Sequence, residues 1–342
     1  MSEPGYYSFT RYLEAKKSVD DRALNREVWA ALSAALEAEA AAGEGPLRVL
    51  EAGAGIGTML ERIFDWNLLD PARAGFSQVR CRAVDADARS LAQAALRLRQ
   101  WAAGRGYSLT ELPDGRTPWK AGGARKLPGG HSAGKAFEVG LRLERPGQQA
   151  EICLQAADIL QYAARSENRG SCDLLIAHAF LDLLDLPQAL PALLGLLRPG
   201  GLFYFTLNFD GATLLEPALD PELDELIQAL YHRSMDERRV EGRPSGDSRT
   251  GRRLFQALQR CGAQVLAAGA SDWVVFPTSG GYPGDEAYFL HFILHTIEGA
   301  LQGSPALDAG ALSRWAGERR AQVERGELVY IAHQLDFAGR VG

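Results

Sequence analysis

The stretch RVLEAGAGIGTML, residues 48–60, decides the fold that this chain of 342 residues is expected to adopt. Glycine stands at every second position in it, as Gly53, Gly55 and Gly57, and a carboxylate, Glu51, comes two residues before the first glycine. Glycine tolerates left-handed backbone and the close approach of other atoms. The spacing therefore indicates a tight turn with other atoms packed close against its backbone.

The sequence on each side of the glycines predicts a strand before them and a helix after them. Residues 47–50 form a short apolar run after a Gly-Glu-Gly-Pro turn, which is typical of a buried strand. Residues 58–66 carry leucine, isoleucine and phenylalanine at helical spacing. A turn from strand to helix points backbone N–H groups and a helix N-terminus at a ligand, and it suits an anionic group.

Two other glycine-rich motifs do not fit this stretch. The dinucleotide fingerprint G-x-G-x-x-G would need its third glycine at position 58, where the chain has Thr58. A phosphate-binding loop would end in Gly-Lys-Ser or Gly-Lys-Thr, which the stretch lacks. A glycine-rich turn without any ligand stays open at this point.

The chain alternates between expected strands and expected helices. Its N-terminal part places leucine and valine on one helical face over 19–42, with Asp20 or Asp21 as the cap. The alternation predicts an α/β fold with a doubly wound, mostly parallel sheet, in which ligands bind outside the carboxyl ends of the strands. The expected strands end in the glycines, in Asp85-Ala86-Asp87, in Ala157-Asp158-Ile159, in Ala177-His178-Ala179-Phe180 and in Asn208-Phe209-Asp210.

Motifs along residues 47–208 resemble those of the class I S-adenosylmethionine-dependent methyltransferases, of the type that acts on small molecules. The glycine stretch resembles their motif I, E/D-x-G-x-G-x-G. The segment CDLLIAHAFLDLLD resembles motif IV, and LLRPGGLFYFTLN resembles the L-K/R-P-G-G turn before the fifth strand. The resemblance implies a Rossmann-like, mostly parallel sheet of seven strands whose last strand is antiparallel. The C-terminal third of the chain fits this family only in outline.

The resemblance also implies S-adenosylmethionine as the methyl donor and S-adenosylhomocysteine as the product. Asp85 is similar to the residue that binds both ribose hydroxyls, since a carboxylate accepts two O–H bonds in one plane. Asp158 is similar to the residue that accepts from the adenine amino group, with Ile159 against the ring. The cofactor-binding residues implied in this way are Glu51, Gly53, Ala54, Gly55, Gly57, Asp85, Ala86, Asp158, Ile159 and His178.

Four regions are expected along the chain. Residues 1–46 are expected to form an N-terminal helical lid. Residues 47–276 form the cofactor-binding core, which contains an excursion and a hairpin over 103–157. Residues 277–326 form a helical insertion, and residues 327–342 form the last strand of the sheet and a tail. A lid and an insertion of this kind exclude water and competing nucleophiles.

Methyl transfer needs little covalent help from the protein, because the sulfonium methyl is already activated. The acceptor must lie in line with the S–CH3 bond for an SN2 transfer, and such positioning supplies roughly 7 to 11 kcal/mol. His178 is the candidate general base, since an imidazole with a pKa of about 6.5 suits that role. The alternative is that His178 only positions the cofactor or caps the next helix. The candidate contacts to the acceptor are Tyr12, Asp182, Asn208 and Arg249.

Three further clusters admit two interpretations each. The arginines over 233–253 either bind an anionic acceptor or belong to a solvated surface of mixed charge, because acidic residues interleave with them. The aromatic residues over 6–12 form either a lid on the acceptor or plain packing. His291 and His295 have the i, i+4 spacing of metal ligands, with Glu298 one turn on, but their apolar helix favours packing, and no metal is expected.

Composition narrows the class of partner. The formal net charge of −6 and the lack of DNA-methyltransferase signatures at motif IV favour a small-molecule acceptor, with no DNA expected. The four cysteines stand far apart and the N-terminus has no apolar signal core, which together predict a cytoplasmic protein. The longest apolar stretch, 287–294, is too short to span a membrane. The sequence leaves open whether the protein forms a homodimer.

Two other functions stay open on the sequence. One is a regulatory or scaffold protein that binds S-adenosylmethionine without transferring its methyl group. The other is a methyltransferase that acts on a peptide, a protein or RNA. A nicotinamide-dependent enzyme is disfavoured by the displaced third glycine.

Overall fold

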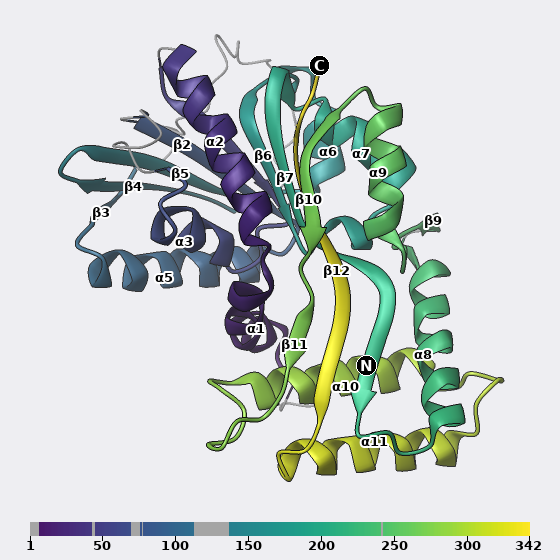
Figure 1. Cartoon of the computed structure of the whole chain (residues 1–342). Coiled ribbons are helices and arrows are strands. Elements are labelled where there is room, and N and C mark those ends of the chain that lie inside the picture. The colour runs from purple at the N-terminus through teal and green to yellow at the C-terminus, as the bar shows by residue number, and fades with distance from the viewer. Residues whose placement is uncertain (1–6, 43–44, 70–75, 77, 113–136, 241) are drawn as a thin grey trace, which may run out of the picture.

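The computed structural model describes residues 7–42, 45–69, 76, 78–112, 137–240 and 242–342. A twisted sheet lies between two groups of helices, and a further group of helices lies beyond one end of it (Figure 1). The main helices are α1 (Phe9–Ala23), α2 (Arg26–Ala42), α3 (Thr58–Asp65), α5 (Ala88–Gly104), α6 (Ile159–Ala163), α7 (Leu186–Leu194), α8 (Pro221–Asp236), α9 (Thr250–Arg260), α10 (Glu286–Leu301) and α11 (Ala309–Glu324). The strands of the sheet are β1 (Leu47–Ala52), β2 (Gln78–Asp85), β3 (Ser108–Glu111), β4 (Glu138–Arg145), β5 (Gln148–Ala156), β6 (Cys172–His178), β7 (Leu197–Glu216), β10 (Gln264–Ala270), β11 (Trp273–Val275) and β12 (Val329–Arg340).

In the described part of the chain, the sheet has the strand order β10-β12-β7-β6-β1-β2-β5-β4-β3, and β11 pairs with β12. The neighbours from β5 to β7 are parallel, whereas β12 is antiparallel to both β7 and β10. The structure confirms the predicted Rossmann-like α/β class, with a mostly parallel sheet and an antiparallel last strand. The seven strands implied by the resemblance correspond to β1, β2, β5, β6, β7, β10 and β12, and β4 is the first arm of the predicted hairpin, antiparallel to β5. The strands β3 and β11 lie outside this count.

The order of the strands reverses between β1 and β6. From β1 the chain builds outward through β2 and β5, and it then returns to the other side of β1 with β6 and β7. An open α/β sheet has its ligand crevice outside the carboxyl ends of the strands at such a reversal. The glycine turn follows β1 directly, and His178 ends β6, so both lie at this switch point.

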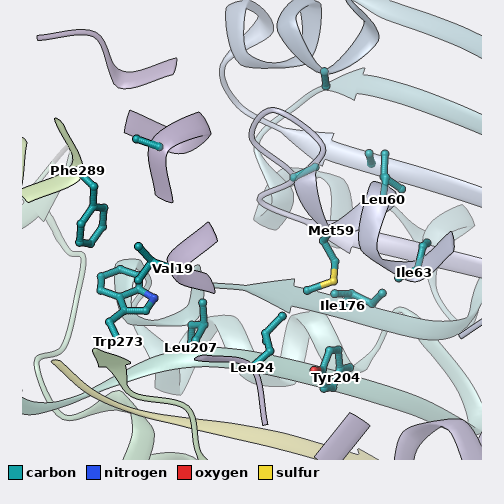
Figure 2. Close-up of a cluster of buried hydrophobic side chains, with 14 of the residues drawn as sticks. Val19, Leu24, Met59, Leu60, Ile63, Ile176, Tyr204, Leu207, Trp273 and Phe289 are labelled. Carbon is teal, nitrogen blue, oxygen red and sulfur yellow. The ribbon is translucent and has the colours of Figure 1, made fainter. Parts of the chain in front are cut away.

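Each face of the central strands has its own apolar core, because successive side chains of a strand point to opposite faces. Leu174 and Ile176 pack with residues of α2, α3 and α5, whereas Leu175 and Ala177 pack with residues of α6, α7 and α9. The first core continues beyond the sheet toward α10. Figure 2 shows members of this core, including Ile63, Met59, Ile176, Tyr204, Leu207, Leu24, Val19, Trp273 and Phe289.

Two long strands carry the helices that lie beyond the sheet. β7 has 20 residues and β12 has 12, and their pairing runs from Leu202 opposite Arg340 to Glu216 opposite Val329. Figure 1 shows both strands leaving the main sheet toward α8, α10 and α11. No helix in the described ranges combines the length and the apolar composition that crossing a bilayer requires.

The N-terminal segment differs from the single capped helix predicted over 19–42. It forms two helices, α1 and α2, and Asn25 caps the second by accepting from the backbone N–H groups of Glu27 and Val28 at 3.0 and 3.1 Å. The prediction that Asp20 or Asp21 is the cap is therefore wrong. Both aspartates lie inside α1, where their carboxylates are available for contacts with the core.

Candidate active site

The backbone N–H groups of the three glycines in the turn are engaged in hydrogen bonds within the protein. Gly53, Gly55 and Gly57 have φ angles of 70°, 52° and 78°, in the left-handed region that other residues rarely adopt. Gly53 and Gly57 each donate to a backbone carbonyl at 2.9 Å, and Gly55 donates to Oδ2 of Asp85 at 2.8 Å. The N–H groups of the three glycines are therefore not free to bind an anion, although a strand-to-helix turn suggests that role.

The turn is also closely covered, which explains why side chains are excluded from it. A Cβ atom on Gly53 would lie 2.2 Å from the ring of Phe180, and one on Gly55 would lie 3.3 Å from Leu13 of α1. A Cβ atom on Gly57 would lie 3.2 Å from α5. Gly57 thus serves the packing of α3 on α5, whereas Gly53 and Gly55 lie beneath Phe180 and α1.

Two carboxyl groups stand beside the turn. Glu51 is 2% exposed, and its Oε2 has no hydrogen-bond partner in the described part of the chain. Burial raises the pKa of Glu51 to about 8, against the charge of Arg62 and with a smaller contribution from Asp85. Asp85 accepts from the N–H groups of Gly55 and Asp87, both at 2.8 Å, and each of its oxygens keeps a lone pair for a ligand. A buried carboxyl without a partner indicates a place that a ligand completes.

The end of β5 lies at the same edge of the sheet. The backbone N–H of Ala157 donates to the carbonyl of Asp85 at 2.9 Å, so the ends of β2 and β5 are joined there. Asp158 is exposed and caps α6 by accepting from a backbone N–H at 2.8 Å, and Ile159 is 5% exposed. Ala86 is exposed beside Asp85. Ala54 is buried within the glycine turn.

His178 lies within a buried network of polar groups at the end of β6. Its Nδ1 is 2.8 Å from Oγ1 of Thr206, and its Nε2 is 3.1 Å from Oδ2 of Asp20 and 3.0 Å from Nη1 of Arg62. Burial, and then the charge of Arg62, lower the pKa of His178 to about 4, so the ring is neutral at physiological pH. Since both ring nitrogens contact protein groups, these contacts favour a positioning role over that of a general base.

Asp20 is the centre of this network and fixes α1 to the core. Its carboxylate is 1% exposed, accepts from Nε1 of Trp273 at 2.9 Å and lies 3.0 Å from Nζ of Lys16. Arg62 also bonds the adjacent Asp21 at 2.6 Å. Burial alone would raise the pKa of Asp20, but its positive neighbours and the bond with the imidazole hold that pKa well below its ordinary value. Neither Arg62 nor Trp273 was predicted as a functional residue, although the i, i+4 spacing of Lys16 and Asp20 is a local signal for this network.

The aromatic residues of the N-terminal segment pack against α10. Tyr12 stacks on Phe292 with ring centroids 4.3 Å apart, and Tyr7 stacks on His295 at 4.2 Å. Tyr6 lies outside the described residues. His291 contacts Glu324 of α11 at 3.0 Å, so the two histidines have different partners. No group of three or more His, Cys, Asp or Glu in the described ranges is arranged to hold a metal ion.

The four candidate acceptor residues lie in different environments. Asp182 follows β6 in a short 3-10 turn, and its buried Oδ1 has no hydrogen-bond partner among the described residues. Asn208 is fully buried and donates to the carbonyl of Leu335 at 2.8 Å, which joins β7 to β12. Arg249 is exposed at the start of α9. Tyr12 is half-buried on α1, where the helix faces α10.

Three arginines after α8 bind groups of the protein itself. Arg252 contacts Asp210 at 2.9 Å, and Arg253 contacts Asp247 at 2.6 Å. Arg238 donates to the backbone carbonyl of Ser245. These contacts favour the interpretation of the segment as a surface of mixed charge.

No protein-family model matches the chain, and no curated protein matches its sequence. Among solved structures, the chain is similar to phosphoethanolamine N-methyltransferase 2 of Haemonchus contortus in complex with phosphomonomethylethanolamine and S-adenosylhomocysteine. The identity is 10% and the TM-score 0.41, over 97% of this chain and 57% of that one, so the chain spans little more than half the length of that protein. It is also similar to geranyl diphosphate C-methyltransferase from Streptomyces coelicolor, with 9% identity and a TM-score of 0.37 over 90% of this chain and 78% of that one. The function is therefore inferred from the site itself.

Proposed function

We propose that this protein is an S-adenosylmethionine-dependent methyltransferase that moves a methyl group to a small-molecule acceptor by in-line SN2 transfer. The proposal rests on one observation: the glycine turn, Glu51 and Asp85 lie together at the switch point of the sheet. S-adenosylmethionine has a positively charged sulfonium and a positively charged ammonium, which suit two neighbouring carboxyl groups. Its ribose has two hydroxyls that Asp85 can accept.

The residues present fit that ligand. Asp85 would hold the ribose, Glu51 would accept from the ammonium of the methionine part, and Asp158 and Ile159 would face the adenine. When bound, the sulfonium supplies a methyl group that is already activated for attack. We further propose that α1 acts as a lid, since Leu13 lies against the glycine turn, and that the covered site excludes water.

The Glu51→Gln substitution tests the fit of the cofactor. The folded protein keeps a proton on Glu51 up to about pH 8, whereas the unfolded chain loses it near the ordinary pKa of 4.5. Glu51 therefore makes the folded state less stable as the pH rises through this range, and a glutamine in its place removes that effect. We expect the variant to unfold roughly 2 to 4 °C higher than the wild type at pH 8 in differential scanning calorimetry.

The same substitution is expected to weaken cofactor binding. An ammonium beside Glu51 favours its ionised form, so the wild-type affinity for S-adenosylhomocysteine should rise with pH by up to about tenfold per unit below pH 8. That rise should disappear in the variant. Glu61→Gln is the matched control, because Glu61 is also a buried glutamate with a raised pKa but pairs with Arg97. An equal effect of both substitutions on affinity would contradict the role of Glu51.

Transfer itself is tested with S-adenosylmethionine that carries a labelled methyl group. Small acceptors that present an amine, a hydroxyl, a thiol or a carboxylate are compared with a peptide library and with RNA. The proposal predicts label in a small acceptor. Label found only in peptide or RNA would indicate a methyltransferase that acts on macromolecules. Binding of S-adenosylmethionine without transfer of label to any acceptor would favour a regulatory protein.

A further inference from the structure

Three tyrosines from three elements interact electrostatically with one another, and two of them interact with Asp182. They are Tyr12 of α1, Tyr231 of α8 and Tyr330 of β12. Tyr12 and Tyr330 pack on the same ring, Phe289, with centroid distances of 5.7 and 6.0 Å. Burial raises the pKa of the Tyr12 phenol, the charge of Asp20 raises it further, and smaller contributions come from Tyr330, Tyr231 and Asp182, so these groups lie within electrostatic reach of Tyr12.

The tyrosine–aspartate cluster consists of Tyr12, Tyr231, Tyr330 and Asp182, and one side-chain oxygen of each makes no hydrogen bond to another described residue. The three phenol hydroxyls make no hydrogen bond to another described residue, and their oxygens keep some access to solvent. The Oδ1 atom of Asp182 is buried and also has none. Buried polar groups in native proteins are nearly always hydrogen-bonded, so the unpaired Oδ1 of Asp182 indicates a missing ligand, and the three phenol hydroxyls are available to bond it.

The other charged groups near Asp182 are engaged elsewhere. Lys16 of α1 lies 3.0 Å from Asp20, and Arg238 donates to backbone carbonyls. Asp247, before α9, pairs with Arg253. Burial raises the pKa of Asp182 to about 6, against the charges of Lys16 and Arg238. Asp182 is therefore largely ionised at neutral pH without a fixed counter-charge.

We infer that the tyrosine–aspartate cluster binds the methyl acceptor, and that this acceptor is an amine. The inference rests on the proposed function and names the substrate class of the same site. Tyrosine rings attract an ammonium through cation–π interaction, and the carboxylate and the phenol oxygens accept its N–H bonds. An anionic acceptor would instead face a buried carboxylate.

Asp182 also supplies the acid–base chemistry that an amine requires. The carboxylate takes one proton from the ammonium, which leaves a neutral amine with a free lone pair. That lone pair forms the new N–C bond while the C–S bond of the donor breaks and its electrons remain on sulfur. The product leaves as a methylammonium, and Asp182 returns its proton to water. His178 has no free ring nitrogen for this step, whereas Asp182 has an unused oxygen.

Binding is tested first, with benzylamine, benzyl alcohol and benzoate as probes on the complex of the full chain with S-adenosylhomocysteine. The three probes share one ring and differ in the charge and the donors of one group. We expect benzylamine to bind roughly tenfold to a hundredfold more tightly than the other two, the range of one hydrogen bond to a charged group. Equal or tighter binding of benzoate, or no binding of benzylamine at millimolar concentration, overturns the inference.

The Asp182→Asn variant then tests the assignment to this residue, with Asp185→Asn as the matched control. Asp185 lies three residues on, before α7, and its side chain makes no capping hydrogen bond. We expect Asp182→Asn to lose the preference for benzylamine and to slow transfer to amines by about 10² to 10⁴-fold. The acidic limb of the wild-type rate, which rises with pH as Asp182 ionises, should vanish in this variant alone.

A second variant, Tyr231→Phe, removes one hydroxyl and should weaken the binding of benzylamine. Its transfer rate should still rise with pH on the acidic side, as in the wild type. Affinity for S-adenosylhomocysteine, measured on every variant, shows whether each protein is folded. If the wild type binds no S-adenosylhomocysteine, the proposed function fails. If it binds that ligand and the amine preference survives in Asp182→Asn, only the inference about the acceptor fails.

Discussion

Asp20→Ala is expected to lower the free energy of unfolding by about 3 to 5 kcal/mol, because it leaves buried positive charges without their partner. Lys16 and Arg62 lie 3.0 and 3.5 Å from the Asp20 carboxylate, and all three side chains are buried. Trp273 loses the acceptor of its Nε1–H as well. Urea unfolding followed by circular dichroism measures the loss, and hydrogen exchange shows whether α1 opens first.

Asp285→Asn is the control for Asp20→Ala. The ion pair of Arg11 with Asp285 also joins α1 to the start of α10, at 2.9 Å, but both side chains are about half exposed. An exposed pair contributes about 0 to 1 kcal/mol. If the two variants lose the same stability, the buried network does not hold α1, and the account of the lid is wrong.

Asp85→Ala is expected to reduce the affinity for S-adenosylhomocysteine by roughly 10² to 10⁴-fold. Two hydrogen bonds from the ribose to the carboxylate, at about 1.5 to 3 kcal/mol each, set this range. The substitution also removes the acceptor that holds the N–H of Gly55 at 2.8 Å, so the glycine turn loses its support. Isothermal titration calorimetry on the folded variant measures the change.

Asp87→Ala separates these effects from a general loss of charge at the edge of the sheet. Asp87 lies two residues away and caps α5 by accepting from the N–H of Arg89. Its removal is expected to cost about 1 kcal/mol of stability and to leave the affinity unchanged. Wild-type affinity in folded Asp85→Ala would show that this residue does not bind the ribose.

The parts of the structure that the sequence predicted depend on local patterns. The glycine spacing placed a tight turn after β1, and alternating apolar segments predicted the parallel strands and the residues at their ends. The switch point followed from the α/β class, because the carboxyl ends of such strands share one edge. Asp85 illustrates this, since a residue at the end of β2 accepts from Gly55 in the turn after β1.

The remaining features depend on contacts between distant segments. In the sequence, Asp20 is a residue type that often caps helices and stands where a cap is expected. Its buried carboxylate instead accepts from Trp273, a residue 253 positions away. The length of β7 depends on its pairing with β12, which the residues of β7 alone do not show. The tyrosine–aspartate cluster draws on α1, α8, β12 and the turn after β6, and no spacing in the sequence links these segments.

Calorimetric titration of the wild-type protein with S-adenosylhomocysteine, and separately with NAD, tests the central claim most directly. We expect one S-adenosylhomocysteine to bind per chain and NAD not to bind. The turn lacks the third glycine of the dinucleotide fingerprint, and the buried Oε2 of Glu51 has no hydrogen-bond partner among the residues that the structure describes. Binding of NAD without binding of S-adenosylhomocysteine would contradict the account.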